Sequence, residues 1–161
     1  MFLKAVTELP IDFEAVRAGM LDGPDRWLDP LADAAGHDQD RLLVDVGLGP
    51  GGGAPTRPAS LSLGTPVVLG DRVLSLPLRL RMSDHAALFP VLDGNLDVAW
   101  LGEGRTYLAM AVQYEPPFGL LGRVADGALL HRVSELVVQR FLASAATRLT
   151  ELCAAPDAAT R

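Results

Sequence analysis

Few residues of this chain have the type and spacing that catalysis or metal binding requires. The three histidines are His37, His85 and His131, and no two of them have the spacing of metal ligands on one element. The single cysteine, Cys153, has no Cys-x-x-Cys partner, and no serine lies in a Gly-x-Ser-x-Gly elbow. We therefore expect no metal and no cofactor, and the sequence assigns no catalytic residue.

The glycine-rich segment Gly47–Pro58, with the sequence GLGPGGGAPTRP, superficially suggests a phosphate-binding loop. A P-loop ends in Lys-Ser or Lys-Thr and opens a helix, and a dinucleotide-binding loop carries spaced glycines before a helix. Here three prolines intervene and a strand-like pattern follows. We therefore expect a plain flexible loop over Gly47–Pro58.

Composition limits the class of protein. The chain has 161 residues, and 14 Lys and Arg against 20 Asp and Glu give a net charge of −6. This balance argues against nonspecific nucleic-acid binding, which needs a basic face. No apolar run approaches the roughly 18 residues of a membrane span, and Lys4 and Glu8 interrupt any leader-like start. Because one cysteine cannot form an internal disulfide, we expect a cytoplasmic protein.

The first third of the chain predicts one strand and two short helices. Met1–Leu9 has the mixed alternation of a strand. Asp12 is a suitable N-cap for a helix to about Gly19, and Pro24 suits the first turn of a second helix over Asp25–Ala35.

From Arg41 onward the apolar residues recur with period two, as in strands. The predicted strands are Leu42–Leu48, Leu61–Leu69 with a bend or break at Gly64 and Pro66, Val73–Met82, Leu96–Trp100 and Leu108–Tyr114. Together they predict an antiparallel meander with one apolar face. Because Pro77 lacks an N–H, its strand is expected to be an edge strand or to be bulged there.

After Pro116-Pro117 the apolar period becomes helical from Phe118 to Leu152, with a break expected near Gly127. We therefore predict an α+β fold in which a curved antiparallel sheet of six or seven strands wraps a long C-terminal helix. A single domain is expected over residues 1–153, followed by a flexible tail over 154–161.

The inward face of the predicted sheet and the apolar stripe of the helix are the most informative set. They either fill a core or line a hydrophobic cavity, in which the polar ends of Trp100 and Tyr114 would need partners. The candidate cavity residues are Leu78, Leu80, Trp100, Leu108, Met110, Val112, Tyr114, Val133 and Val137. The polar candidates for a cavity mouth are His85 at a strand end and Arg123 and Arg132 beside the helix start.

Two segments carry a resemblance to a known family. They are Tyr114–Arg123, with the sequence YEPPFGLLGR, continuing to LLHRV at Leu129–Val133, and LFPVLDG at Leu88–Gly94. With the order of the elements, they resemble the START-like or SRPBCC superfamily, which has the helix-grip fold and includes polyketide cyclase/dehydrase-like and lipid-carrier proteins. The resemblance implies a ligand cavity between the sheet and the C-terminal helix.

Three functions follow from these observations. The first is binding of a small hydrophobic or amphipathic molecule by a monomer or homodimer. The second is a polyketide cyclase- or dehydratase-like enzyme on an aromatic substrate, which needs Tyr114, His85 or an arginine to point inward together. The third is a pocketless structural or dimerisation module, in which Leu129, Leu136 and Leu142 would form an exposed patch.

Overall fold

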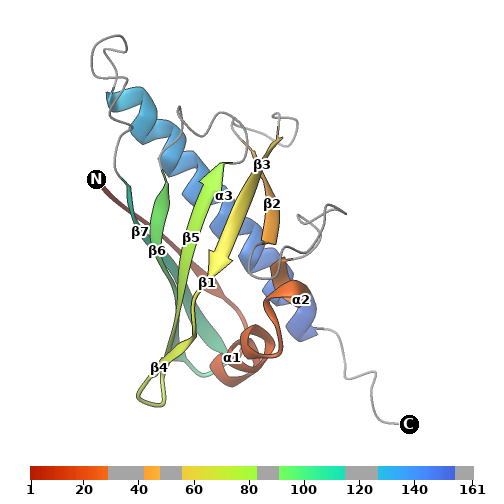
Figure 1. The fold of residues 1–161 in the computed structure, drawn as a ribbon. Coiled ribbons are helices and arrows are strands. Elements are labelled where there is room, and N and C mark those ends of the chain that lie inside the picture. The colour runs from red at the N-terminus through yellow and green to blue at the C-terminus, as the bar shows by residue number, and fades with distance from the viewer. Residues whose placement is uncertain (29–41, 48–55, 83–90, 115–126, 155–161) are drawn as a thin grey trace.

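In a computed structural model of the chain, seven antiparallel strands form one sheet that is covered by a long helix (Figure 1). The residues described are 1–28, 42–47, 56–82, 91–114 and 127–154. The strands are β1 (Phe2–Leu9), β2 (Leu42–Gly47), β3 (Thr56–Leu63), β4 (Val67–Leu69), β5 (Val73–Met82), β6 (Leu92–Gly102) and β7 (Arg105–Tyr114). Their order is β1-β7-β6-β5-β3-β2, and β4 pairs with β5 beside β3.

The long helix α3 (Gly127–Ala154) runs diagonally across one face of the sheet (Figure 1). It contacts both β1 and β2, which are the strands at the two ends of the sheet order. A sheet can reach one helix with both of its ends only if it curves around that helix. The α+β fold with a curved sheet of six or seven strands is therefore confirmed.

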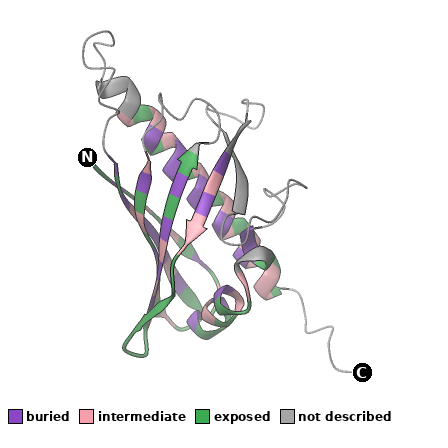
Figure 2. Ribbon diagram, in the orientation of Figure 1, coloured by how far each residue is buried: buried purple, intermediate pink, exposed green. Residues whose placement is uncertain are grey.

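Alternation along the strands builds the core. On β5 the leucines at even positions are buried, whereas Arg79 and Arg81 are exposed. Buried residues likewise follow one side of α3, where Val137, Phe141 and Leu149 face the sheet (Figure 2). The period of the apolar residues, two in the strands and three to four in the helix, thus predicted which face of the sheet packs against which side of α3.

Two short helices pack at one end of the sheet. In α1 (Phe13–Leu21), the Asp12 carboxylate accepts a hydrogen bond from the Glu14 N–H at 2.9 Å, so the predicted N-cap is confirmed. In α2 (Pro24–Leu28), Pro24 occupies the first turn, as predicted. The expected continuation to Ala35 lies outside the described residues. Both helices contact α3.

Pro77 lies in a central strand and pairs in register with Asn95 of β6, so neither the expected edge strand nor the expected bulge is found there. β5 pairs with β6 on one side and with β3 and β4 on the other. Its β3 pairing begins at Leu78 and its β4 pairing ends at Ser75, so the missing N–H of Pro77 faces the break between β3 and β4. The predicted interruption at Gly64 and Pro66 is this same break.

The expected loop over Gly47–Pro58 is too long by four residues, because β2 ends at Gly47 and β3 already begins at Thr56. Thr56–Pro58 pairs with β2, while pairing with β5 starts only at Ala59. Among the described residues, Pro58 therefore has no strand on its second side, where the sheet tolerates a missing N–H.

At the C-terminal end, α3 begins at Gly127, where the sequence predicts a break. Residues 118–126 and the predicted tail after Ala154 lie outside the described residues. None of the described helices is long and apolar enough to cross a membrane.

Candidate functional site

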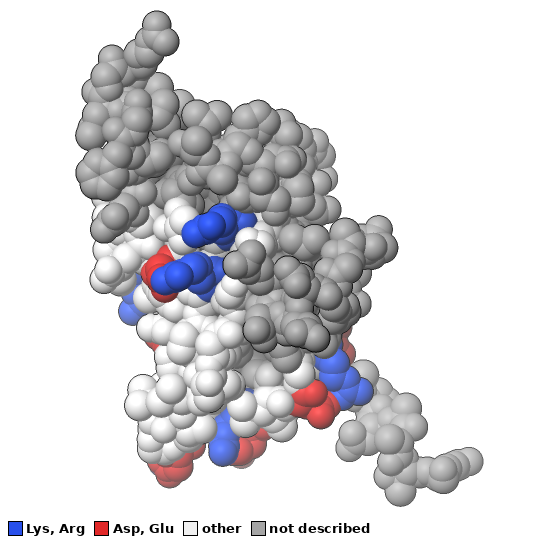
Figure 3. All heavy atoms as spheres, in the orientation of Figure 1, with Lys and Arg blue, Asp and Glu red and all other residues white. Residues whose placement is uncertain are grey.

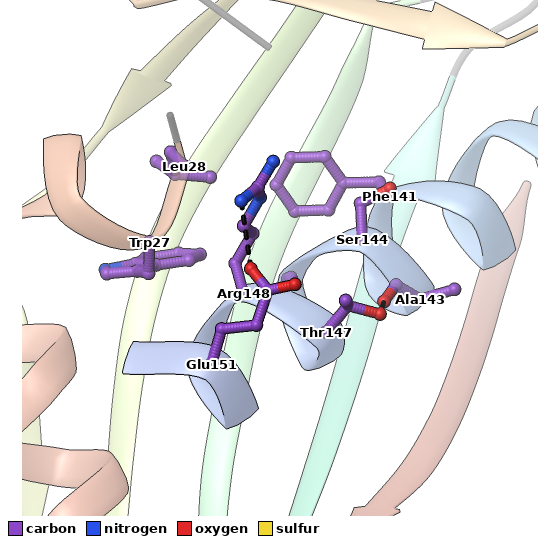
Figure 4. Close-up of a pocket in the computed structure, with 9 residues that line it drawn as sticks. Trp27, Leu28, Phe141, Ala143, Ser144, Thr147, Arg148 and Glu151 are labelled. Carbon is purple, nitrogen blue, oxygen red and sulfur yellow. Dashed lines mark hydrogen bonds and ion pairs between the residues drawn. The ribbon is translucent and has the colours of Figure 1, made fainter. Parts of the chain in front are cut away.

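A pocket of about 350 Å³ opens between α2 and α3 (Figure 4). We call it the α2–α3 pocket. Its lining residues are Trp27, Leu28, Phe141, Ala143, Ser144, Ala145, Thr147, Arg148 and Glu151. Seven of these residues come from about three turns of α3, from Phe141 to Glu151, and the other two come from α2.

The floor of the α2–α3 pocket is apolar and its rim is polar. Trp27, Leu28 and Phe141 are at most 5% exposed, so they form a floor packed into the core. At the rim, the Arg148 guanidinium donates a hydrogen bond to the Glu151 carboxylate at 2.9 Å (Figure 4). An apolar floor with a few polar rim groups is typical of sites for small organic ligands.

The indole N–H of Trp27 is buried and has no hydrogen-bond partner among the described residues. An unpaired buried donor costs about 1–3 kcal/mol. Sequence reasoning did not select Trp27 as a site residue. The available signal was its size and its position one turn after Pro24, which indicate a buried aromatic residue but not a pocket.

Most of the predicted cavity residues are packed in the core. The buried members are Leu78, Leu80, Leu108, Met110, Val112, Tyr114 and Val137, and Val133 is half-buried. None of the nine predicted cavity residues lines the α2–α3 pocket. Their contact with a ligand stays a prediction.

The alternation predicted that Trp100 faces the core. This prediction is wrong, because Trp100 is 44% exposed. It lies two residues beyond Val98, the last buried residue of β6, and the β6–β7 pairing becomes irregular after it. Its ring instead stacks under the Arg72 guanidinium, 4.5 Å from the ring centre. Alternation of apolar residues along a strand predicts the side of the sheet on which a side chain lies. It does not predict how far along the strand the covering helices extend.

Tyr114 finds the polar partner that its burial requires. Its hydroxyl lies 2.9 Å from His131 Nδ1 on α3 and 2.9 Å from Met1 Sδ. Burial raises the pKa of the Tyr114 phenol, because the charged phenolate loses solvation there. The sequence predicted that a buried Tyr114 needs a polar partner, but it did not predict this pair.

The three polar candidates for a cavity mouth have different outcomes. His85 and Arg123 lie outside the described residues. Arg132 is exposed on α3 and does not line the α2–α3 pocket. Among the described residues, no cluster of three or more His, Cys, Asp or Glu side chains could hold a metal ion.

Cys153 is expected to react slowly with iodoacetamide in the folded protein. Its thiol is half-buried and donates to the Ala15 carbonyl at 3.5 Å, and burial raises its pKa. A raised pKa leaves less thiolate at neutral pH, and thiolate is the nucleophile. The rate of alkylation should therefore reach half its maximum at higher pH in the folded protein than in urea. Identical pH profiles in both states would contradict this.

Comparison with known proteins gives the fold. No protein-family model and no curated protein matches the sequence. Solved structures do match, including a conserved protein from Geobacillus kaustophilus, with 13% identity and a TM-score of 0.57 over 94% of this chain and 96% of that one.

Two further matches come from Mycobacterium smegmatis. A START superfamily protein has 15% identity and a TM-score of 0.53 over 93% of this chain and 94% of that one. Protein Ms6760 has 16% identity and a TM-score of 0.52 over 99% and 92% of the two chains. With the curved sheet wrapped on α3, these similarities show that the chain has the START-like helix-grip fold.

Proposed function

We propose that this chain binds a small hydrophobic or amphipathic molecule in the α2–α3 pocket. The observation that carries the proposal is a pocket of about 350 Å³ with an apolar floor and a polar rim. Pockets for small organic ligands start at about 300 Å³.

We further propose that residues 1–153 form one domain and that it acts in the cytoplasm, in line with its single cysteine.

The lining suggests how an amphipathic ligand is oriented. Its apolar part packs against Trp27 and Phe141, with at most about 25 cal/mol gained per Å² of apolar surface before the costs of association. Its polar end lies at the rim, beside Arg148 and Glu151. Both of these side chains are at least 40% exposed, and exposed ion pairs contribute little stability, so an acidic head group competes for Arg148 at small cost.

The enzyme alternative has one supporting observation, the Tyr114–His131 pair, which joins a possible acid and a possible base. This pair is far from the α2–α3 pocket. His131 and Phe141, the nearest lining residue on α3, are 10 positions apart, which corresponds to about 15 Å along the helix. A cyclase reaction in the pocket would therefore need other groups, and ligand binding is the better-supported function.

The pocketless alternative predicted an exposed apolar patch on α3. Leu142 is 3% exposed and Leu136 is half-buried, so the structure does not provide that patch at these two residues. The side chain of Leu129 lies outside the described set. This alternative therefore has less support than ligand binding.

Ser144→Leu is expected to weaken binding of an amphipathic fluorescent dye, anilinonaphthalene sulfonate, at least tenfold. Ser144 lines the pocket and is half-buried, so a leucine there projects into the space that the dye would occupy. Leucine is a good helix former, so α3 should stay intact. A fluorescence titration of each protein, with native mass spectrometry for a co-purified ligand, measures the effect.

The matched control is Gln139→Leu, which adds the same side chain to an exposed position of α3 outside the pocket. It should leave the affinity for the dye unchanged. Equal weakening by both variants, or wild-type protein that binds no dye saturably, would contradict the proposed site.

A further inference from the structure

A second hollow, of about 340 Å³, lies on the outer side of the sheet, where β3, β5 and β6 run side by side. We call it the outer groove. Its lining residues are Ser60, Ser62, Leu63, Gly64, Pro77, Leu78, Arg79, Arg81 and Asp93. The polar members alternate along β3 and β5 with the buried residues Ala59, Leu61 and Leu80, so they face away from α3.

The strand register brings the polar side chains of the outer groove together. Ser60 lies directly opposite Arg81, and Ser62 lies opposite Arg79. Directly opposed residues have Cβ atoms about 4.5–5.5 Å apart. Two hydroxyls and two guanidinium groups thus form a compact array across β3 and β5.

One arginine of the array is neutralised and the other is not. Arg79 Nε donates to the Asp93 carboxylate at 2.9 Å, and its Nη2 donates to the same oxygen. No acidic side chain of the described residues pairs with Arg81, which is exposed. The groove therefore carries a net charge of +1, from two arginines and one aspartate, in a chain whose net charge is −6. Figure 3 shows basic side chains gathered beside an acidic one on this face.

The break between β3 and β4 shapes one end of the outer groove. There the Gly64 N–H donates to the Pro77 carbonyl at 2.7 Å. A Cβ atom on Gly64 would lie only 2.8 Å from Pro77 Cβ, so the close approach of the two backbones depends on glycine. This end of the groove is formed by backbone, so its shape does not depend on mobile side chains.

We propose that the outer groove binds a small organic anion through a carboxylate or phosphate group. Arg81 supplies the charge and a planar pair of N–H donors that match either oxyanion. The Ser62 hydroxyl supplies a further donor from the opposite strand, whereas the Ser60 hydroxyl donates to the Arg81 carbonyl at 3.3 Å. This site is on the other side of the sheet from α3. The proposal of anion binding therefore does not depend on the proposal of ligand binding in the α2–α3 pocket.

The test is an NMR titration of the ¹⁵N-labelled protein with inorganic phosphate and, separately, with acetate, at constant ionic strength set with chloride. We expect saturable shifts of the Ser60, Ser62 and Arg81 amides with at least one of the two anions. A response to phosphate alone identifies a phosphate ligand, and a response to acetate alone identifies a carboxylate ligand. Shifts that stay linear with both anions would overturn the proposal.

Three variants make the test specific. Arg81→Gln should raise the Kd for the anion at least tenfold, whereas Asp93→Asn should lower it severalfold because it frees Arg79. The control is Arg105→Gln, at an exposed arginine that pairs with Glu8 on the β1–β7 edge, and it should leave the Kd unchanged.

The dispersion of the amide signals in the same NMR spectra reports whether each variant is folded. Equal Kd values for wild type and a folded Arg81→Gln protein would overturn the proposal.

Discussion

Gly94→Ala is expected to lower the free energy of unfolding by about 3 kcal/mol, at the upper end of the usual cost of overpacking. Gly94 lies in β6, opposite Val112 of β7. A Cβ atom there would overlap the Ala111 carbonyl oxygen and lie 2.7 Å from Val112 Cα. Both are backbone atoms, so no rotamer change relieves the clash, and the β6–β7 pairing must open locally. Urea unfolding of both proteins measures the loss.

Gly102→Ala is the control, in the same strand. An added Cβ on Gly102 meets no atom within 4 Å, and its φ is outside the left-handed region. Its substitution should change the stability by less than about 0.5 kcal/mol, as for most surface positions. Similar losses in both variants would show that the loss of glycine in β6, and not the clash with β7, determines the effect.

The sequence predicted the faces of the elements well because burial imposes their periods. The alternating leucines of β5 and the apolar stripe of α3 were predicted to face each other, either as a filled core or as the lining of a cavity, and both are buried. The Asp12 cap was also predictable, because a carboxylate that accepts from an N–H two residues on is a local interaction. Features that depend on neighbouring residues of one element are therefore accessible without a structure.

The pocket could not be predicted, because its walls come from distant parts of the chain. Trp27 precedes Phe141 by more than a hundred residues, and no pattern in either segment says that α2 packs beside the C-terminal half of α3. The outer groove has the same origin. The alternation along Val73–Met82 predicts one apolar face, but the proximity of Arg79 and Arg81 to Ser60 and Ser62 follows from the β3–β5 register.

Trp100 and Tyr114 show two further limits of pattern reasoning. Trp100 continues the alternation of β6 but extends past the covered part of the sheet, so it is exposed. Tyr114 was expected to need a polar partner, yet the identity of that partner depends on how α3 lies across β7. His131 meets Tyr114 only because α3 crosses the sheet in the observed direction.

Met110→Ala is expected to lower the free energy of unfolding by about 2–5 kcal/mol, because the lost transfer free energy and the new cavity add. Met110 lies at the centre of β7, is 0% exposed and belongs to the main core cluster. A side chain that bordered an empty ligand-sized cavity would retain exposed surface. Met110→Leu, which nearly conserves the volume, should cost less than about 1.5 kcal/mol. Urea unfolding of the three proteins gives both values.

The same variant decides between two positions for the ligand. Met110 does not line the α2–α3 pocket, so Met110→Ala should keep the dye affinity of wild type under conditions where it is folded, whereas Ser144→Leu should lose it. A small loss of stability with altered dye binding would instead place the ligand between the sheet and α3, against the nine residues first predicted there. A large loss with unchanged binding would leave that face as core, because a residue cannot both fill the interior and line a vacant cavity.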